Sequence, residues 1–390
     1  MEHWNEAKIK DFAEVKGGKR LPKGKQLIKE PNSHPYIRIR DLGKTKYLQL
    51  NSEYEYVDDE TQQSIARYIV NKGDILISVV GTIGLIGIVG ETLDKANQTE
   101  NCDKIINIKN VLPEYLYYYL ISSFGQDEIR KGTVGAVQPK LPLKNVQDIT
   151  IFYPSIEEQE RIVNILSSVD EKIETNNAIN NNLEQQAQAI YQQMFIDNAR
   201  SNWAEGTLSD IADITMGQSP SGSSYNEDGT GTIFFQGRAE FGFRFPSVRL
   251  YTTEPKRMAR SNDTLMSVRA PVGDLNVAHT DCCIGRGLAA IHSKSNHQSF
   301  VLYTMFSLKK QLDVFNGEGT VFGSINRNSL NDMPILIPSD DILDEFERIV
   351  APMDLTFRNN YDENCRLQDI RDTLLPRLMS GELDVSDIDI

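Results

Sequence analysis

The chain reads Val146-Gln147-Asp148-Ile149-Thr150-Ile151-Phe152-Tyr153-Pro154 and, about 184 residues further on, Leu330-Asn331-Asp332-Met333-Pro334-Ile335-Leu336-Ile337-Pro338. An acidic stretch containing Glu-Arg-Ile-Val follows each copy, at 160–163 and at 347–350. Upstream, Gly73-Asp74-Ile75-Leu76-Ile77-Ser78-Val79 has a partner in Asn262-Asp263-Thr264-Leu265-Met266-Ser267-Val268. A repeat of this length is a domain and not one turn of a solenoid. The sequence therefore predicts two related domains, which would present two related surfaces to a partner.

The composition narrows the class of protein. A length of 390 residues suits two domains, and the sequence has no apolar run long enough to span a bilayer. The opening Met1-Glu2-His3-Trp4 does not start a signal segment, so we expect a cytoplasmic protein with no membrane partner. The four cysteines lack CxxC spacing and the five histidines form no ligand pattern. We therefore expect reduced thiols and no metal site.

The charge is unevenly distributed along the chain. The 55 Asp and Glu residues outnumber the 41 Lys and Arg residues, and the net charge of −14 by itself argues against a phosphate-binding surface. Two stretches run against this balance, because 16–46 is rich in Lys and Arg and 238–286 is rich in Arg. Such segregation is compatible with nucleic-acid binding, although a solvated face is the commoner cause of a run of charges.

Two large segments, 1–154 and 205–338, combine short strand and helix patterns. Residues 36–40 alternate between apolar and basic side chains, and 74–80 is a β-branched run, so both predict strands. Two short helices are expected before the final strands, over 114–121 and 299–308.

Two further segments, 156–196 and 341–379, predict long helices that pair with each other. The first carries a seam with alternating steps of four and three residues: Ile162, Leu166, Val169, Ile173, Asn176, Asn180, Leu183, Ala187, Ile190 and Met194. The seam recurs about 184 residues later, including both asparagines. Antiparallel pairing places Asn176 opposite Asn364 and Asn180 opposite Asn360. Because a buried seam asparagine is best known as a register device, we expect these four to fix the register. The alternative is two amphipathic helices, each packed on its own domain.

Together these features resemble the specificity subunit of type I restriction–modification systems. The resemblance covers nearly the full chain, and rests on the motif at 73–78 with its copy at 263–267 and on the junctions at 153–159 and 337–338. It also rests on the closing Leu374-Leu375-Pro376-Arg377-Leu378-Met379-Ser380-Gly381-Glu382-Leu383. It implies an α+β fold, with two pseudo-symmetric mixed α/β target-recognition domains separated by a long antiparallel two-helix coiled coil. The corresponding boundaries are 1–154 and 205–338 for the recognition domains, 155–204 and 339–381 for the spacer helices, and 382–390 for an acidic tail.

The resemblance also implies a function and a set of partners. In this family each recognition domain reads one half of a split, asymmetric DNA target, and the helices act as the ruler between the halves. The chain would be a non-catalytic subunit without a cofactor, and S-adenosylmethionine would bind to a modification subunit that methylates adenine. The implied partners are double-stranded DNA and two modification subunits, while the presence of restriction (translocase and endonuclease) subunits stays open. The sequence contains neither an Asn/Asp-Pro-Pro-aromatic motif nor a GxxxxGK[ST] loop, which agrees with this assignment.

DNA reading requires Arg or Lys on guanine edges, Asn or Gln on adenine, and cations for phosphates. The first domain offers a basic set: Lys19, Arg20, Lys23, Lys25, Arg38 and Arg40. The second domain offers a mixed set: Gln218, Ser219, Gln236, Arg238, Arg244, Arg269 and Arg286. For any single residue in these sets, a solvated charge or a structural ion pair is an equally good explanation.

Two other functions compete with this interpretation. One is the specificity half of a split methyltransferase with some activity of its own, against which the missing Pro-Pro motif argues. The other is a protein-interaction scaffold that does not bind DNA. Binding of S-adenosylmethionine by the isolated chain would favour the first, and duplex DNA affinity that is absent or insensitive to salt would favour the second.

Overall fold

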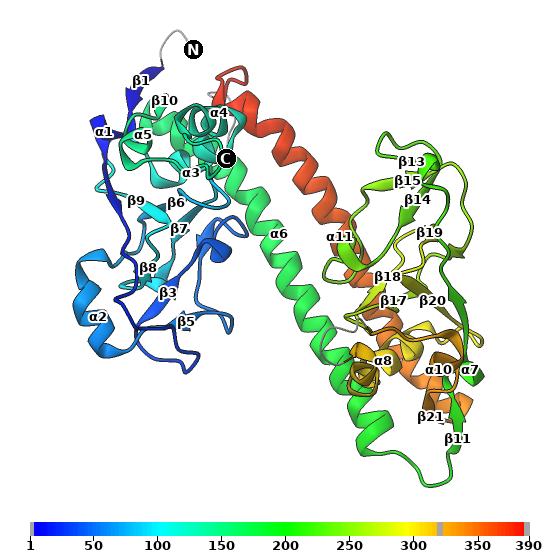
Figure 1. The fold of residues 1–390 in the computed structure, drawn as a ribbon. Helices are drawn as coiled ribbons and strands as arrows, with labels where there is room; N and C mark the ends of the chain where they lie inside the picture. Colours follow the sequence, from blue (N-terminus) through cyan, green and yellow to red (C-terminus); the bar gives the residue numbers. More distant parts are fainter. Residues whose placement is uncertain (1–3, 318–322, 386–390) are drawn as a thin grey trace. The chain divides into compact units, whose positions relative to one another are not determined.

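The computed structural model describes residues 4–317 and 323–385. The chain divides into two compact units: unit 1 comprises Met1–Asn176 with Asp362–Ile390, and unit 2 comprises Asn177–Tyr361. Two long helices, α6 (Ile156–Tyr191) and α11 (Asp340–Met379), contribute residues to both units (Figure 1). Residues 386–390 of the expected acidic tail lie outside the described part of the chain.

Unit 1 is built on a five-stranded sheet in the order β2-β9-β6-β7-β4, in which β4 is parallel to β7 and the other pairs are antiparallel. A three-stranded sheet, β5-β3-β8, and the pair β1-β10 accompany it. The strands are β1 (Asn5–Lys8), β2 (Glu14–Gly17), β3 (Pro35–Ile37), β4 (Tyr47–Leu48), β5 (Glu55–Tyr56), β6 (Ile75–Ser78), β7 (Ile86–Val89), β8 (Asn97–Gln98), β9 (Cys102–Ile106) and β10 (Thr150–Tyr153). The helices are α1 (Ile9–Phe12), α2 (Asp59–Ile65), α3 (Pro113–Ile121), α4 (Ser123–Gly132) and α5 (Leu143–Gln147).

Unit 2 is built on a four-stranded antiparallel sheet in the order β12-β20-β17-β18. A five-stranded sheet, β13-β15-β14-β19-β16, and the pair β11-β21 accompany it. The strands are β11 (Ala204–Thr207), β12 (Ala212–Met216), β13 (Tyr225–Asn226), β14 (Thr232–Phe235), β15 (Leu250–Thr252), β16 (Met258–Ala259), β17 (Thr264–Ser267), β18 (Leu275–Val277), β19 (Cys282–Ile284), β20 (Leu288–Ser293) and β21 (Pro334–Ile337). The helices are α7 (Leu208–Ile211), α8 (Gln298–Ser307), α9 (Lys309–Leu312) and α10 (Arg327–Asn331), and α6 ends in a π-helical turn at Gln192–Asp197.

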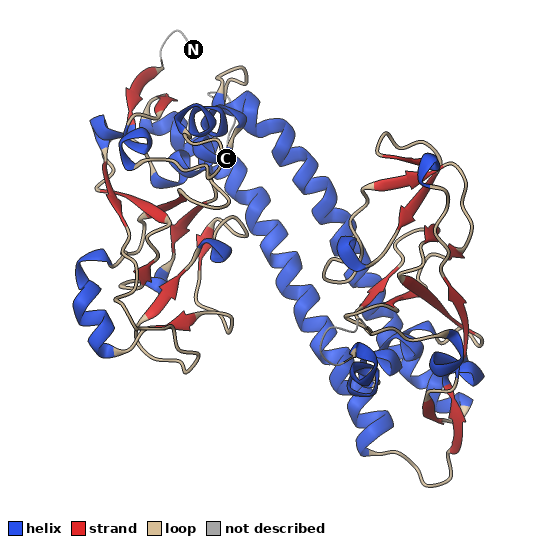
Figure 2. Ribbon diagram, in the orientation of Figure 1, coloured by secondary structure: helices blue, strands red, loops and turns tan. Residues whose placement is uncertain are grey.

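The two units share one plan of strands and helices (Figure 2). In unit 1, β6 lies between β7 and β9, just as β17 lies between β18 and β20 in unit 2. A parallel pair that joins strands far apart in sequence recurs in the two units, as β3 with β8 in unit 1 and β14 with β19 in unit 2. The first and last strands of each unit pair with each other, β1 with β10 and β11 with β21. This architecture confirms the α+β class with two related domains.

One expected strand is shorter than the alternation at 36–40 predicts. The strand β3 ends at Ile37, and a 3-10 turn follows at Ile39–Asp41. The reason is local, because the backbone N–H of Arg38 donates to the Asp41 carboxylate at 2.7 Å and closes the turn. A side chain that accepts a hydrogen bond from nearby backbone competes with strand pairing.

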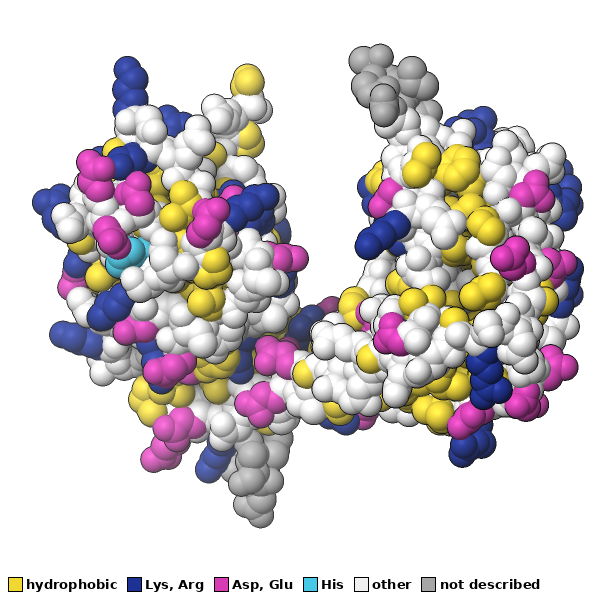
Figure 3. Space-filling view, turned by 90° about the horizontal axis from the view of Figure 1, so that it is seen from below, with side chains coloured by type: hydrophobic (Ala, Val, Ile, Leu, Met, Phe, Trp, Pro, Cys, Tyr) yellow, Lys and Arg dark blue, Asp and Glu magenta, His cyan; other side chains and the backbone are white. Residues whose placement is uncertain are grey.

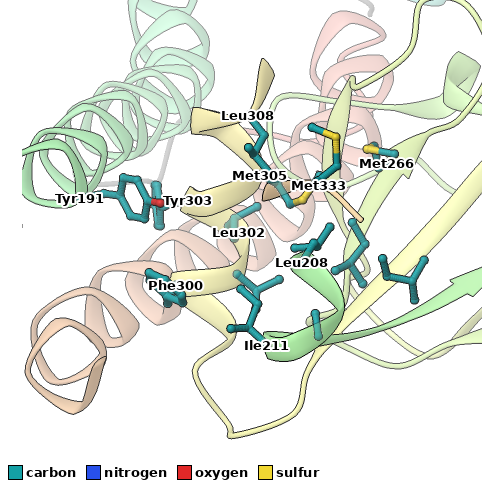
Figure 4. Packing of buried hydrophobic residues seen from close by; sticks show 14 of the residues in the cluster. Tyr191, Leu208, Ile211, Met266, Phe300, Leu302, Tyr303, Met305, Leu308 and Met333 are labelled. Carbon is teal, nitrogen blue, oxygen red and sulfur yellow. The ribbon is translucent and has the colours of Figure 1, made fainter. Parts of the chain in front are cut away.

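The core of each unit includes part of both long helices. In unit 2, Tyr191 of α6 packs against Phe300 of α8 (Figure 4). Phe346 of α11 packs against both of these rings. Helix α8 is buried from Ser299 to Met305, as expected for a helix that is apolar all round. In unit 1, Leu166 of α6 and Leu378 of α11 belong to the cluster around α3. Burying one such side chain contributes about 1.5–3 kcal/mol, so each unit is tied firmly to the helices.

The asparagines of the seam meet within each unit. In unit 1, Asn176 Nδ2 donates to Asn364 Oδ1 at 2.9 Å. In unit 2, Asn360 Nδ2 donates to Asn180 Oδ1 at 2.8 Å, and Asn180 Nδ2 donates to the backbone oxygen of Phe357 at 3.4 Å. In unit 1, Asp170 lies before Asn176 on α6 and pairs with Arg371, which lies after Asn364 on α11. In unit 2, Tyr191 lies after Asn180 on α6 and packs against Phe346, which lies before Asn360 on α11, so the helices run antiparallel in both units. That these four asparagines determine the register stays a prediction.

A buried carboxylate in unit 1 makes its stability depend on pH. Asp103 in β9 is 4% exposed, its Oδ2 has no hydrogen-bond partner, and burial raises its pKa to about 6. Because an unfolded aspartate has a pKa of about 3.9, the folded state binds more protons between roughly pH 4 and 6, and stability falls as the pH rises through that window.

We therefore expect Asp103→Asn to raise the free energy of unfolding by about 1–3 kcal/mol above pH 7 and to have little effect near pH 4. Thermal unfolding at both pH values measures the difference. The exposed Asp213→Asn serves as the control. Equal effects of Asp103→Asn at both pH values would contradict the assignment.

Candidate nucleic-acid interface

In unit 2, the ends of several strands surround an open hollow of about 390 Å³. Gln236 follows β14, Arg269 lies two residues beyond β17, and Arg286 lies two residues beyond β19. Arg238 and Arg249 also line the hollow. The structure thus brings together four of the residues that the sequence predicted for DNA binding, Gln236, Arg238, Arg269 and Arg286.

Two more predicted residues lie on the strand-end segment next to this hollow. Ser219 Oγ accepts a hydrogen bond from the backbone N–H of Arg286 at 3.2 Å. The backbone N–H of Gln218 donates to the carbonyl of Ile284 at 3.0 Å. Gln218 is exposed.

Close backbone contacts hold the segments around the hollow in place. The N–H of Gly285 donates to the carbonyl of Phe235 at 2.8 Å, and the N–H of Val268 donates to the carbonyl of Gly287 at 2.9 Å. A Cβ on Gly217 would come within 2.1 Å of the Gly285 carbonyl oxygen, so glycine is required there. The side chains on these segments therefore start from fixed backbone positions.

The arginines of the hollow differ in their partners. Arg238 pairs with Asp274 at 2.6 Å, and Arg249 pairs with the buried Glu240 at 2.9 Å, which raises the pKa of Arg249. Arg269 and Arg286 are exposed and form no ion pair with any residue that the structure describes. Their guanidinium groups are therefore the ones available to a ligand.

In unit 1, most of the predicted basic side chains already have carboxylate partners. Arg20 pairs with Glu100 at 3.1 Å, Arg38 pairs with Glu55, and Lys25 pairs with both Asp58 and Glu60. Arg40 approaches Asp41 at 3.6 Å and Glu55 at 3.5 Å. Lys19 and Lys23 are exposed and have no ion-pair partner within 4–317 and 323–385, although Lys19 lies 5.8 Å from the Tyr68 ring centre.

The prediction for Arg244 is wrong, because this side chain is buried and only 4% exposed. Its guanidinium pairs with Asp354 of α11 at 3.0 Å and with Glu184 of α6 at 3.3 Å, and also donates to the hydroxyl of Tyr303 at 3.1 Å. The Tyr303 hydroxyl donates to Asp354 at 3.1 Å. Arg244 therefore holds the domain of unit 2 on the long helices and cannot reach DNA.

Unit 1 has a corresponding network, which the sequence reasoning missed. In unit 1 the backbone carbonyl of Lys46 accepts a hydrogen bond from the N–H of Ile88 in β7. In unit 2 the backbone carbonyl of Arg244 accepts one from the N–H of Val277 in β18, the strand that corresponds to β7. Lys46 and Arg244 therefore occupy equivalent places in the two units. Lys46 is 5% exposed, and its Nζ donates to Ser167 of α6 at 2.8 Å and to the Tyr118 hydroxyl at 3.4 Å. The Tyr118 hydroxyl in turn donates to Asp170 at 2.7 Å.

A signal for this network was present in the sequence. Asp170 and Asp354 are separated by the same interval of about 184 residues as the repeated motifs, and a tyrosine recurs in the short helix of each unit. Burial raises the pKa of both Tyr118 and Tyr303 well above the usual value, so both stay protonated donors.

The described residues give no sign of a metal site or a membrane span. Among them, no group of three or more His, Cys, Asp or Glu side chains could hold a metal ion. No helix in the described ranges is long and apolar enough to cross a membrane. On the face that Figure 3 draws, basic and acidic side chains are interspersed over each unit.

The geometry defines a duplicated mixed-sheet module, each copy packed on its own part of a shared helix pair. A family model described as the type I restriction modification DNA specificity domain matches residues 1–185 and 200–356, and the chain belongs to this family. It is 26% identical to the type I restriction enzyme MjaIX specificity subunit of Methanocaldococcus jannaschii, over 99% of this chain and 94% of that protein. It is 24% identical to the type I restriction enzyme HindI specificity subunit of Haemophilus influenzae, over 90% of this chain and 95% of that protein.

A solved structure has a similar fold. The S subunit of a type I restriction–modification system from M. genitalium superimposes with a TM-score of 0.60 at 17% identity, over 96% of each chain.

The buried networks predict a large cost for removing one charge. Asp354→Asn leaves the buried Arg244 with Glu184 as its remaining carboxylate, and we expect a loss of about 2–4 kcal/mol in the free energy of unfolding. Asp372→Asn is the matched control, because it removes an exposed partner of Arg371 and should cost about 0.5 kcal/mol or less. Urea unfolding measures both variants, and an Asp354→Asn effect as small as the control would contradict the anchoring role.

Proposed function

We propose that this chain is the DNA sequence-specificity subunit of a type I restriction–modification complex. The observation that carries the proposal is the duplication, since the chain divides into two compact units and the family model matches twice. Each recognition domain reads one half of a bipartite, asymmetric target. In unit 2 the reading surface is the hollow with its neighbours: Gln218, Ser219, Gln236, Arg238, Arg269 and Arg286.

In unit 1 the proposed surface is the basic set: Lys19, Arg20, Lys23, Lys25, Arg38 and Arg40. Lys19 and Lys23 are exposed and suited to phosphate contacts. The other four side chains are paired with carboxylates, which offset their positive charge. This pairing favours contacts that depend on geometry over a general attraction to DNA. Because the net charge is −14, tight binding requires partner subunits that supply further phosphate contacts.

The chemistry of the complex belongs to other subunits in this proposal. Two modification subunits dock on the chain, bind S-adenosylmethionine and methylate adenine, one in each half of the target. The chain itself is non-catalytic and positions the modification subunits on the DNA target. Restriction subunits with translocase and endonuclease activity join the complex in a system that also cleaves DNA.

Separate reading of the halves predicts modularity. Exchange of residues 1–154 for the equivalent domain of another family member should change one half of the methylated motif and leave the other half intact. Methylated-base sequencing of a host that expresses the variant with the modification subunits measures this. Exchange of 205–338 is the reciprocal control, and a swap that altered both halves would contradict separate reading.

The spacer should follow the helices. We expect that one heptad inserted between Asn176 and Asn180, together with one between Asn360 and Asn364, lengthens the seam by about 10 Å. Both asparagine pairs survive, and the methylated motif should gain roughly three base pairs between its halves. A heptad inserted in α6 alone is the control, because it separates the asparagine pairs and should impair folding. An unchanged spacer in a folded double insertion would refute the ruler role.

A further inference from the structure

We propose that the hollow of unit 2 is a guanine-reading site, in which Arg269 and Arg286 donate to the O6 and N7 atoms of guanine in the major groove. The inference rests on the proposed DNA specificity and states which base that specificity includes. An arginine fork that meets the O6 and N7 acceptors is the commonest base-specific contact between proteins and DNA. Gln236 stands in the same hollow and suits an adjacent adenine.

The free guanidinium groups are the first support. Of the four arginines in the hollow, Arg238 and Arg249 are neutralised by carboxylates, whereas Arg269 and Arg286 pair with no carboxylate in the described ranges. Glu240, which also lines the hollow, is 7% exposed, and its Oε2 has no hydrogen-bond partner. That carboxylate is already paired with Arg249, so the guanidinium groups of Arg269 and Arg286 are the donors in the hollow that no described carboxylate occupies.

The fixed backbone is the second support, because base reading needs a positioned fork while phosphate attraction does not. The N–H of Arg286 is held by Ser219 Oγ at 3.2 Å. Arg269 forms a backbone bridge with Ser324, and the next N–H, that of Ala270, donates to the carbonyl of Gly323 at 3.0 Å. The hydrogen bond from Val268 to Gly287 then ties the two arginine-bearing segments to each other.

The corresponding place in unit 1 has the opposite chemistry. In unit 1 the N–H of Val79 donates to the carbonyl of Asn101, and in unit 2 the N–H of Val268 donates to the carbonyl of Gly287. These matching hydrogen bonds align the backbone frame of the two units residue by residue. In this alignment Val80 stands where unit 2 has Arg269, and its backbone bridge to Lys140 matches the bridge of Arg269 to Ser324. Glu100 stands where unit 2 has Arg286. The frame therefore does not require arginine at either position, and unit 1 does not read guanine in this way.

The test uses the complex of this chain with its modification subunits. Methylated-base sequencing first gives the wild-type motif, and exchange of 205–338 identifies the half read by unit 2. We expect a guanine in that half. Binding of the wild-type complex is then measured with duplexes that carry 7-deazaguanine, which lacks N7, or hypoxanthine, which keeps both O6 and N7. We expect 7-deazaguanine to weaken binding and hypoxanthine to leave it unchanged.

Variants assign the contact to residues. Arg286→Ala and Arg269→Ala should reduce discrimination against other bases at the guanine position by about 5- to 150-fold. Arg257→Ala, an exposed arginine outside the hollow, is the control and should leave the preference unchanged. If the variants fail to fold, the duplex analogues with the wild-type complex still decide the question.

Two results would overturn the inference while leaving the proposed function intact. One is a unit 2 half-site without guanine on either strand, and the other is a pair of variants that weaken binding equally for all sequences. A wild-type complex without any sequence-specific methylation would instead overturn the proposed function, and the inference with it.

Discussion

Each unit depends on a buried cation that its domain shares with a long helix. Lys46 and Arg244 are almost fully excluded from water, and each meets a tyrosine hydroxyl together with a helix residue, Ser167 in unit 1 and Asp354 in unit 2. A domain that moved away from its helix would leave that charge without its partners in an apolar site, which costs several kcal/mol. The attachment is therefore close to all-or-none, and it does not involve the surface that would meet DNA.

In unit 2, the anchoring residue Arg244 and the proposed reading residues Arg269 and Arg286 lie on different segments of the chain. The chain segments that lead to Arg269 and Arg286 are held by backbone hydrogen bonds, which any side chain permits. Unit 1 keeps the same frame with Val80 and Glu100 in those places. Side chains at the reading positions can therefore change while the fold and its anchoring to the helices stay the same, as a protein that must tell DNA sequences apart requires.

The sequence predicted what local patterns determine, and missed what distant contacts determine. The duplicated motifs were enough to predict the two domains, and the periodic seam with its recurring asparagines was enough to predict the antiparallel helices. Arg244 and Arg286 looked alike in the sequence, because burial of the first depends on Asp354, which lies 110 residues away along the chain. The anchoring network was hidden because its cation is lysine in one copy and arginine in the other.

The division of the chain into units also sets an order of assembly during synthesis. Unit 2 is one continuous segment, whereas unit 1 joins the first part of the chain to Asp362–Ile390. The core of unit 1 contains Leu375, Leu378 and Met379, which are synthesised after all of unit 2. The usual order in which the N-terminal domain folds first is therefore reversed here. Until these residues have been synthesised, Ile162 and Leu166 of α6 lack part of their core partners.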